Sequence, residues 1–432
     1  MRRGRQQITG RRQGSYRAWL VLAHRWVGLV IAGFLLVAGL TGALLAWNDE
    51  LEAWVSPELF RVAPPVPGAP PLDPLILRER VQSAFPGAWA SDTPLAPQPG
   101  RALMFNLSAP ADSAMGIEPG LADDQVFVDP YDGRILGARK RGDLAQGMKN
   151  LMPFIYRLHH ELALGVVGSR VFGVVALLWT LDCFVGFCLS LPPRAGHRPR
   201  PGRAVKAGGK SWLARWRSSW QVRWGAGSYK VNFDLHRAGG LWAWAMLFVL
   251  AWSAVAFNLS EVYDPVMKSV FTQQEDGAGL RPLPVPDFVP VIGWREAREV
   301  GRRLMAEQSQ TQGYTILRED GLRYEPWLGV YRYRVLSSRD VGDRWGITSV
   351  TFDAGTGALR DLWLPTGAAS GDTLRTWLTS LHMAAVGGAV ARLPMKLLMC
   401  AVGLAVAMLS ATGLVIWWRK RQGRRRAGHP DS

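Results

Sequence analysis

The sequence predicts an α-helical membrane protein, in which a bundle of four transmembrane helices carries two α+β modules outside the membrane. Three observations support this fold class. Of the 432 residues, 48% are hydrophobic, and they are concentrated in four blocks long enough to cross a bilayer core of about 30 Å. The formal net charge of +17 is concentrated in three of the five segments that flank these blocks. Motifs from the first half recur in the second half, so the chain is predicted to be internally duplicated.

The four apolar blocks divide the chain into nine segments. The first span is unlike a signal peptide, because its apolar run is too long, no small-residue cleavage site closes it, and three spans follow. In order we expect a basic N-terminal segment (1–23), a first span (24–47), a first module (48–158), a second span with its outer flank (159–191), a basic loop (192–235), a third span (236–259), a second module (260–381), a fourth span with its outer flank (382–418) and a basic tail (419–432).

The basic residues predict the orientation of the chain. The N-terminal segment, the central loop and the tail together hold 22 Lys and Arg, against two acidic residues, Asp234 and Asp431. Loops rich in Lys and Arg stay in the cytoplasm. Both termini and the central loop are therefore expected in the cytoplasm, and both modules on the opposite side. This topology accounts for the positive charge, and because no nucleic-acid motif is present we expect no nucleic-acid partner.

Each half of the chain contains the same two kinds of histidine motif. His-Arg with a glycine four residues after the histidine occurs at His24 and again at His236, which is 212 residues later. LHHELALG around His159 matches LHMAAVGG around His382, 223 residues later. A duplicated half of this kind packs as a pseudo-symmetric bundle.

The two modules also follow one plan. Residues 73–85 and 294–308 are each patterned as an amphipathic helix, and strand-like runs follow them. Each module ends in two strands joined by a turn, DPYDG in the first and DAGTG in the second, which is a hairpin signal. The expected strands are 102–107, 125–128 and 134–136 in the first module, and 330–336, 348–352 and 358–363 in the second.

Four of the seven histidines lie where an apolar stretch begins. Ionisable groups at membrane depth are costly and are usually functional. The predicted topology places His24 and His236 together near the cytoplasmic face, and His159 and His382 together near the outer face. Two imidazoles that face each other across a helical bundle form a bis-histidine haem site. The sequence therefore predicts two haem sites, with these four histidines as iron ligands.

Residues beside the inner pair suit the same chemistry. Gly28 and Gly240 lie one helical turn from the histidines on the same face, so a missing side chain leaves room for a flat macrocycle. Arg25 and Arg237 are placed to pair with haem propionates at the interface.

Other histidines and metals fit less well. His160 lies about 100° around the helix from His159, so both cannot face one iron, and the repeat favours His159. His160 remains an alternative ligand. His197 and His429 lie in basic cytoplasmic segments and are expected to be solvated. Zinc is disfavoured because no cysteine and few carboxylates accompany the histidines at ligand spacing.

Asp182 lies near the middle of the second span. Such a carboxyl group either forms a hydrogen bond within the bundle, with Thr180 or Thr412 as possible partners, or serves a proton path. The sequence leaves both interpretations open.

Taken together, these motifs resemble the PepSY-associated transmembrane family, known in bacteria as iron-regulated membrane proteins. The resemblance covers nearly the whole chain and has two departures: Asp182 and Cys183 replace a Thr-Gly pair in the second span, and WSAVAFN replaces TGA in the third. It is carried by the runs HRWVGLVIAGFLLVAGLTGALLAWNDEL, LHHELALG, DLHRAGGLW, SLHMAAVGG, ATGLVIWWRKR, VDPYDGRIL and FDAGTGALR.

The resemblance implies a multi-pass protein of the bacterial inner (cytoplasmic) membrane, with periplasmic PepSY-like modules and two b-type haems per chain. It implies a ferric-siderophore reductase, which passes electrons across the lipid bilayer and releases ferrous iron. No nucleotide-binding or flavin motif is present, so a separate donor is expected, either a quinol or a cytoplasmic reductase. Two alternatives are a binding or regulatory membrane protein without redox activity, and a transporter subunit for iron chelates.

Overall fold

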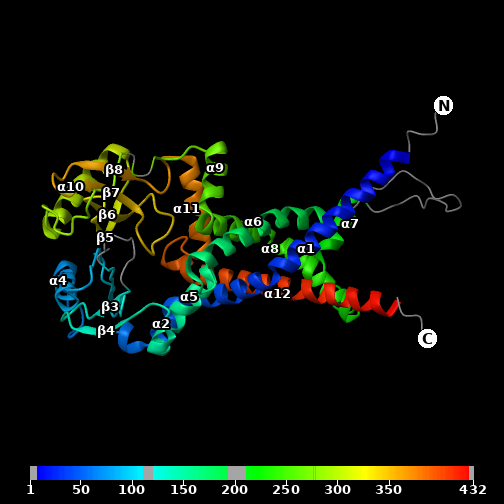
Figure 1. Cartoon of the computed structure of the whole chain (residues 1–432), viewed down its shortest axis with the longest axis horizontal. Coiled ribbons are helices and arrows are strands. Elements are labelled where there is room, and N and C mark those ends of the chain that lie inside the picture. The colour runs from blue at the N-terminus through cyan, green and yellow to red at the C-terminus, as the bar shows by residue number, and fades with distance from the viewer. Residues whose placement is uncertain (1–6, 110–119, 193–210, 276, 278, 428–432) are drawn as a thin grey trace. The chain divides into compact units, whose positions relative to one another are not determined.

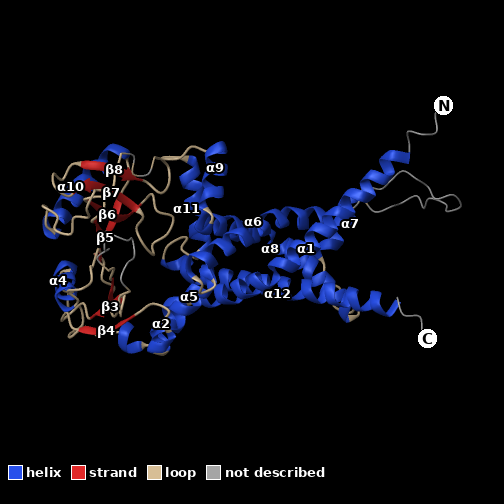
Figure 2. Cartoon of the chain, in the orientation of Figure 1, coloured by secondary structure: helices blue, strands red, loops and turns tan. Residues whose placement is uncertain are grey.

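A computed structural model describes residues 7–109, 120–192, 211–275, 277 and 279–427 (Figure 1). The chain divides into two compact units. We call Met1–Leu44, Leu158–Tyr263 and Leu397–Ser432 the helical unit, and Leu45–Arg157 and Asp264–Lys396 the sheet unit. Among the described residues, strands occur only in the sheet unit (Figure 2). His197 and His429 lie outside the described residues.

Four long helices form the membrane part, as the sequence predicts. They are α1 (Gln7–Leu45), α6 (Gly165–Ser190), α8 (Ser228–Asn258) and α12 (Ala389–Ala427), and a short helix α7 (Trp212–Arg217) with a 3-10 turn η3 (Ser218–Trp220) precedes α8. Each has the length and composition of a membrane span, over Tyr16–Leu45, Gly165–Ser190, Ser228–Asn258 and Ala389–Gly423. Helices α1 and α8 begin before the predicted spans, which start at 24 and 236, so His24 and His236 lie inside helices and not at their first residues.

The other two predicted haem ligands lie on separate short helices. His159 lies on α5 (Leu151–Glu161), and His382 is the last residue of α11 (Ser370–His382). Left-handed backbone follows both helices, at Leu162, Ala163 and Ala384, with φ of 54°, 56° and 52°. These residues separate each outer histidine from the span that follows it, because an α-helix cannot continue through left-handed residues.

Small residues allow close packing between helices of the helical unit. A Cβ atom on Gly39 of α1 would lie 2.6 Å from the carbonyl oxygen of Gly403 of α12. On α6, a Cβ atom on Gly173 would lie 3.0 Å from the carbonyl oxygen of Asn258, whose side chain accepts a hydrogen bond of 2.8 Å from Ser169. Membrane helices associate in this way because lipid provides no hydrophobic driving force between them.

Two antiparallel sheets form the sheet unit. One has the strand order β1-β5-β6-β7-β8 and the other β2-β3-β4. The strands are β1 (Asp92–Pro94), β2 (Leu103–Asn106), β3 (Gln125–Val128), β4 (Ile135–Arg139), β5 (Ile316–Glu325), β6 (Val330–Ser337), β7 (Thr348–Asp353) and β8 (Leu359–Trp363). The remaining helices and 3-10 turns of this part are α2 (Asn48–Val55), α3 (Pro57–Phe60), α4 (Pro74–Ala84), η1 (Leu144–Gln146), η2 (Met148–Asn150), α9 (Ser260–Val270) and α10 (Trp294–Gln312).

Both predicted hairpins are present, as β3–β4 and β7–β8. In the second hairpin, Asp353 Oδ1 accepts hydrogen bonds from the backbone N–H groups of Gly355 and Thr356, which fixes the turn. Strands β1 and β5 are not among the expected strands. Because β1 from the first connection pairs with β5 from the second, the two connections share one sheet and are not independent modules.

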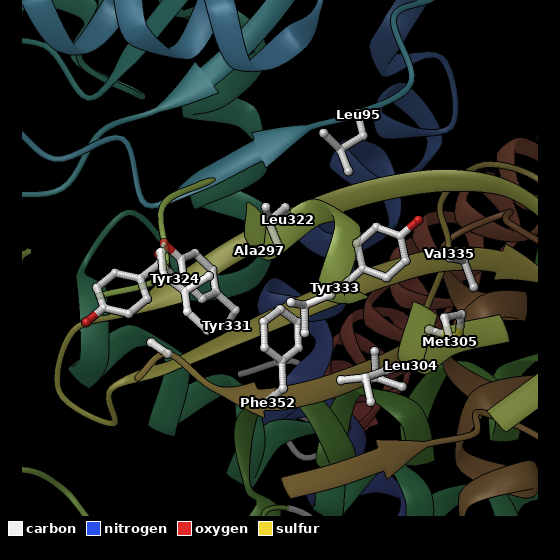
Figure 3. Close-up of a cluster of buried hydrophobic side chains, with 14 of the residues drawn as sticks. Leu95, Ala297, Leu304, Met305, Leu322, Tyr324, Tyr331, Tyr333, Val335 and Phe352 are labelled. Atoms are coloured by element: carbon white, nitrogen blue, oxygen red, sulfur yellow. Dashed lines mark hydrogen bonds between the residues drawn. The ribbon is translucent and has the colours of Figure 1, made fainter. Parts of the chain in front are cut away.

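Helix α10 packs against the five-stranded sheet, and side chains from both form a hydrophobic core. Figure 3 shows part of this core. Ala297 and Met305 of α10 are fully buried, as are Tyr331 and Phe352 of the sheet. Each large side chain buried in this way stabilises the unit by roughly 1.5–3 kcal/mol. Gly301 permits the close approach, because a Cβ atom there would lie 2.6 Å from the ring of Tyr333.

An ion cluster fixes α10 to strand β5. The carboxylate of Glu319 accepts hydrogen bonds from Arg298 (3.1 Å), Arg302 (2.9 Å) and the Tyr333 hydroxyl (2.8 Å). Burial by itself opposes ionisation of Glu319, but these hydrogen bonds outweigh it and lower the pKa of the carboxyl to about 2.

Candidate functional site

The helical unit brings His24 of α1 and His236 of α8 together. Their ring centroids lie 6.0 Å apart, and the ring planes are inclined by 56°. A metal–imidazole bond is about 2 Å long, so two imidazoles bound through Nε2 to opposite sides of one iron have centroids roughly 6 Å apart. The separation of the two rings therefore fits a shared iron atom.

Both rings are held through Nδ1. His24 Nδ1 lies 2.9 Å from each carboxylate oxygen of Asp182, and His236 Nδ1 lies 3.1 Å from the carbonyl oxygen of Leu409 and 3.1 Å from Thr412 Oγ1. A proton on Nδ1 donated to these acceptors leaves the lone pair on Nε2. Within the described part of the chain, neither Nε2 forms a hydrogen bond. Metal-binding histidines are oriented in this way by a second partner on the other ring nitrogen.

The partner of Asp182 differs from both partners weighed from the sequence. Thr180 Oγ1 donates to the carbonyl of Ala176 one turn earlier in its own helix, and Thr412 contacts His236. Asp182 instead lies on the side of α6 that faces α1, where it contacts His24. The carboxylate therefore holds an imidazole ring, and this contact accounts for its burial.

The two predicted propionate partners have unused hydrogen-bond donors. The Nε atoms of Arg25 and Arg237 are both buried without a hydrogen-bond partner among the described residues. Arg237 does use Nη2, which donates to Asp234 (3.0 Å) and to the carbonyl of Ser218 (2.9 Å). A buried N–H without an acceptor is costly. Both guanidinium groups therefore keep a donor available for an anionic group.

Neither predicted glycine is in close contact with a neighbouring helix. A Cβ atom on Gly28 would meet no atom within 4 Å, and one on Gly240 would meet only Leu409, at 3.8 Å. An added methyl group would therefore be tolerated at both positions, and the role of these glycines in making room for a macrocycle stays a prediction.

The third histidine of the helical unit has a similar environment. His159 Nδ1 lies 3.0 Å from Thr41 Oγ1, and a Cβ atom on Gly42 would lie 3.1 Å from the His159 ring. His160 lies 3.6 Å from its neighbour Glu161. The contact with α1 favours His159, rather than His160, as the inward-facing histidine.

A Thr-Gly pair lies against two of the histidines and is a sequence signal for the site. Thr41-Gly42 contacts His159, and Thr412-Gly413 contacts His236 in the same way, with a Cβ atom on Gly413 lying 3.2 Å from the ring. The threonine holds Nδ1, and the glycine lets the ring approach the helix. At His24 the carboxylate of Asp182 replaces the threonine hydroxyl.

An apolar layer separates the two ends of the helical unit. His24 and Thr41 are 17 residues apart on α1, which corresponds to roughly 26 Å along the helix at 1.5 Å per residue. Cys183, Leu247 and Val406 form a buried cluster with Leu35 and Trp179 packed against it, and because Cys183 follows Asp182 in the chain, this cluster begins at the level of His24. The polar groups thus occupy two levels with apolar side chains between them.

His159 belongs to the helical unit and His382 to the sheet unit. Their pairing therefore stays a prediction. Across the described residues, no group of three or more His, Cys, Asp or Glu side chains is placed to hold a metal ion. The His24–His236 pair instead offers two ligands on opposite sides, which suits a metal that carries its other ligands in a macrocycle.

One family model matches nearly the whole chain. A family model described as PepSY-associated TM region matches residues 21–420. This range includes the second and third spans, nearly all of the first and fourth, and all four predicted ligand histidines. No curated protein matches the chain.

Proposed function

Because the chain belongs to the family with a PepSY-associated transmembrane region, we propose that it is a haem protein of the bacterial inner membrane that reduces a periplasmic ferric siderophore. The single observation that carries the proposal is the His24–His236 pair, with centroids 6.0 Å apart and both Nδ1 atoms held by neighbouring helices. A merely structural histidine pair has no need of two unused Nε2 atoms.

The residues of the inner site have distinct roles in this proposal. His24 and His236 would hold the haem iron. Asp182 fixes the orientation of His24, and Arg25 and Arg237 neutralise the propionates. Haem bound there would supply a one-electron redox couple at this depth of the membrane.

The outer site is assigned to His159 and His382, each close to the beginning of a span. Together the two sites provide one electron carrier near each face of the membrane, with the apolar layer of α1, α6, α8 and α12 between them. This layer excludes water and ions, so electrons rather than ions cross the bilayer.

The proposed topology keeps both termini and the basic central loop in the cytoplasm and the sheet unit in the periplasm. A separate donor, a quinol or a cytoplasmic reductase, delivers electrons to the inner site. One electron converts Fe(III) in the siderophore to Fe(II). Hard oxygen ligands that select ferric iron hold ferrous iron weakly, so reduction releases it.

The first experiment is a reduced-minus-oxidised absorption spectrum of the purified protein, with haem counted per chain. We expect two haems in the wild type and one in each of the variants His24→Ala, His236→Ala and His159→Ala. His160→Ala is the matched control, since it removes the adjacent imidazole and should keep both haems. A colourless wild-type protein would refute the proposal and favour a binding or regulatory role.

Reduction is tested separately in membrane vesicles. Ferric siderophore is added on the side of the sheet unit, and a ferrous-specific chelator on the same side traps the product. We expect ferrous iron to form only when an electron donor is present. Movement of labelled chelate through the membrane without reduction would instead indicate a transporter.

A further inference from the structure

A charged cavity lies entirely within the sheet unit. Its volume is about 340 Å³, within the range of about 300–1,000 Å³ that is common for small-molecule sites. Its walls come from both connections between spans: α2, the segments around Arg61 and Arg101, the loop at 343–344, the loop 384–387 and the beginning of α12. We call it the periplasmic-unit cavity, in keeping with the proposed topology.

Positive charge exceeds negative charge in this cavity. Five basic and three acidic side chains line it. Each carboxylate is already paired with one of the cations, as Asp49–Arg344 (2.9 Å), Asp343–Arg392 (3.1 Å) and Glu50–Lys396 (2.7 Å). Two guanidinium groups are left over, those of Arg61 and Arg101. Arg101 donates only a long hydrogen bond of 3.4 Å to the backbone carbonyl of Asp49, and the Arg61 side chain has no partner among the described residues.

The backbone places these two arginines directly opposite each other. Arg61 and Arg101 form an isolated antiparallel bridge, and hydrogen bonds from Val62 N–H to the Gly100 carbonyl and from Ala102 N–H to the Phe60 carbonyl flank it. Residues opposite each other in an antiparallel pair project their side chains from the same face, where like charges are destabilising. An anion bound between the two guanidinium groups removes this repulsion, and guanidinium binds carboxylate oxygens in a bidentate manner.

The cavity wall also adjoins a predicted haem ligand. The loop 384–387 begins two residues after His382, so its first Cα lies within about 7.6 Å of the histidine Cα along the chain. This loop is held in place: Ala384 has a left-handed backbone with φ of 52°, and Gly387 N–H donates to the carbonyl of Val341 at 2.8 Å. Strained backbone of this kind persists where surrounding contacts fix it, often at ligand sites.

From the surplus charge, the opposed arginines and the adjacent histidine, we propose that the periplasmic-unit cavity binds an anionic ferric chelate with carboxylate or catecholate donors. The arginine pair holds the anionic edge of the chelate, and the 384–387 loop places the iron on the side of His382. The identity of the ligand as an iron chelate rests on the proposed function, whereas the preference for anions rests on the cavity alone.

The test measures binding without reduction. Gallium(III) citrate has the charge and shape of ferric citrate but does not accept an electron under these conditions. Its binding to the full-length protein in detergent is measured by calorimetry, beside a cationic gallium trihydroxamate, metal-free citrate and inorganic phosphate. We expect gallium citrate to bind at least tenfold more tightly than each of the other three.

Variants locate the site. Arg61→Gln combined with Arg101→Gln should weaken gallium citrate binding by a hundredfold or more, and each single variant by about tenfold. Arg303→Gln is the matched control, because Arg303 lies on α10 with a side chain 65% exposed and does not line the cavity. The thermal melting temperature of each variant shows that it remains folded.

Three results overturn the proposal: no binding of gallium citrate by the wild type, binding that the double variant leaves unchanged, or equal binding of metal-free citrate or phosphate. The outcome is independent of the haem spectrum. A protein without haem that still binds gallium citrate through these arginines would disprove the proposed electron transfer and leave the cavity assignment intact.

Discussion

Replacing Asp182 by Asn changes one charge beside His24 and very little else. The asparagine side chain has nearly the same size, and its oxygen can still accept the hydrogen bond that Asp182 now accepts from Nδ1 at 2.9 Å. Asp182→Thr is the second variant, because it introduces the hydroxyl group that holds His159 and His236. Both variants therefore keep an acceptor for the ring and remove the carboxylate.

The expected effect is a rise in the reduction potential of the inner site. The Asp182 side chain is only 10% exposed, so its charge is weakly screened. A hydrogen bond to a charged group contributes about 1.5–3 kcal/mol, against about 0.5–1.5 kcal/mol for a neutral one, a difference of roughly 1–1.5 kcal/mol. The carboxylate favours the more positive ferric state. Because a tenfold change in a one-electron equilibrium corresponds to about 59 mV, removing the carboxylate raises the potential by roughly 40–65 mV.

The assay is a spectroelectrochemical titration of the purified protein. We expect one of two redox components to shift upwards in both Asp182 variants, while the other component stays in place. Thr180→Val is the control, because its hydroxyl lies two residues away on α6 and bonds only to its own helix. Unchanged potentials in both Asp182 variants, or an equal shift of both components, would refute the reasoning about His24.

Two further predictions concern stability. Gly39→Ala should destabilise the helical unit by about 1–3 kcal/mol, because its Cβ atom would lie 2.6 Å from the Gly403 carbonyl oxygen. Its melting temperature in detergent should fall below that of Gly33→Ala, whose Cβ atom meets nothing within 4 Å, and equal values would contradict the close packing. Glu319→Gln should destabilise the sheet unit by up to about 3 kcal/mol at pH 7, since the pKa of Glu319 is lowered from 4.5 to about 2 on folding. That contribution is complete above pH 4.5 and is lost as the pH falls towards 2, so unfolding monitored by Trp fluorescence should show a smaller difference at pH 3. Glu299→Gln is the control, because the Glu299 side chain is 67% exposed, and its stability should differ little from the wild type at either pH. A loss of stability in Glu319→Gln that does not change with pH would contradict the ion cluster.

The spans, the hairpins and the histidine motifs follow from local pattern. Membrane helices need long apolar runs, so composition alone predicts α1, α6, α8 and α12. The turns DPYDG and DAGTG predict β3–β4 and β7–β8, because turn geometry restricts residue type. Repetition of His-Arg and of Leu-His predicts which four histidines matter, although it does not tell how any ring is held.

Strand β5 shows where local pattern is not enough. Its sequence ILREDGLRYE contains Asp320-Gly321, which is a turn signal, yet these residues lie in the middle of a strand. Register shifts on either side of Glu319 absorb the irregularity, and pairing with β6 and β1 stabilises the strand. Long-range pairing overrides local preference here, and the sequence contains no local signal for it.

By itself the sequence determined the membrane class and the number of spans, because each depends on the length of the apolar runs, and it showed that two histidine motifs recur at a repeated spacing. Only the tertiary structure decided that Asp182 holds His24, that Thr412 and Leu409 hold His236, and that Arg61 lies opposite Arg101. Each of these contacts joins elements far apart in the chain. Their partners are set by how helices and strands pack, which no periodicity within one segment encodes.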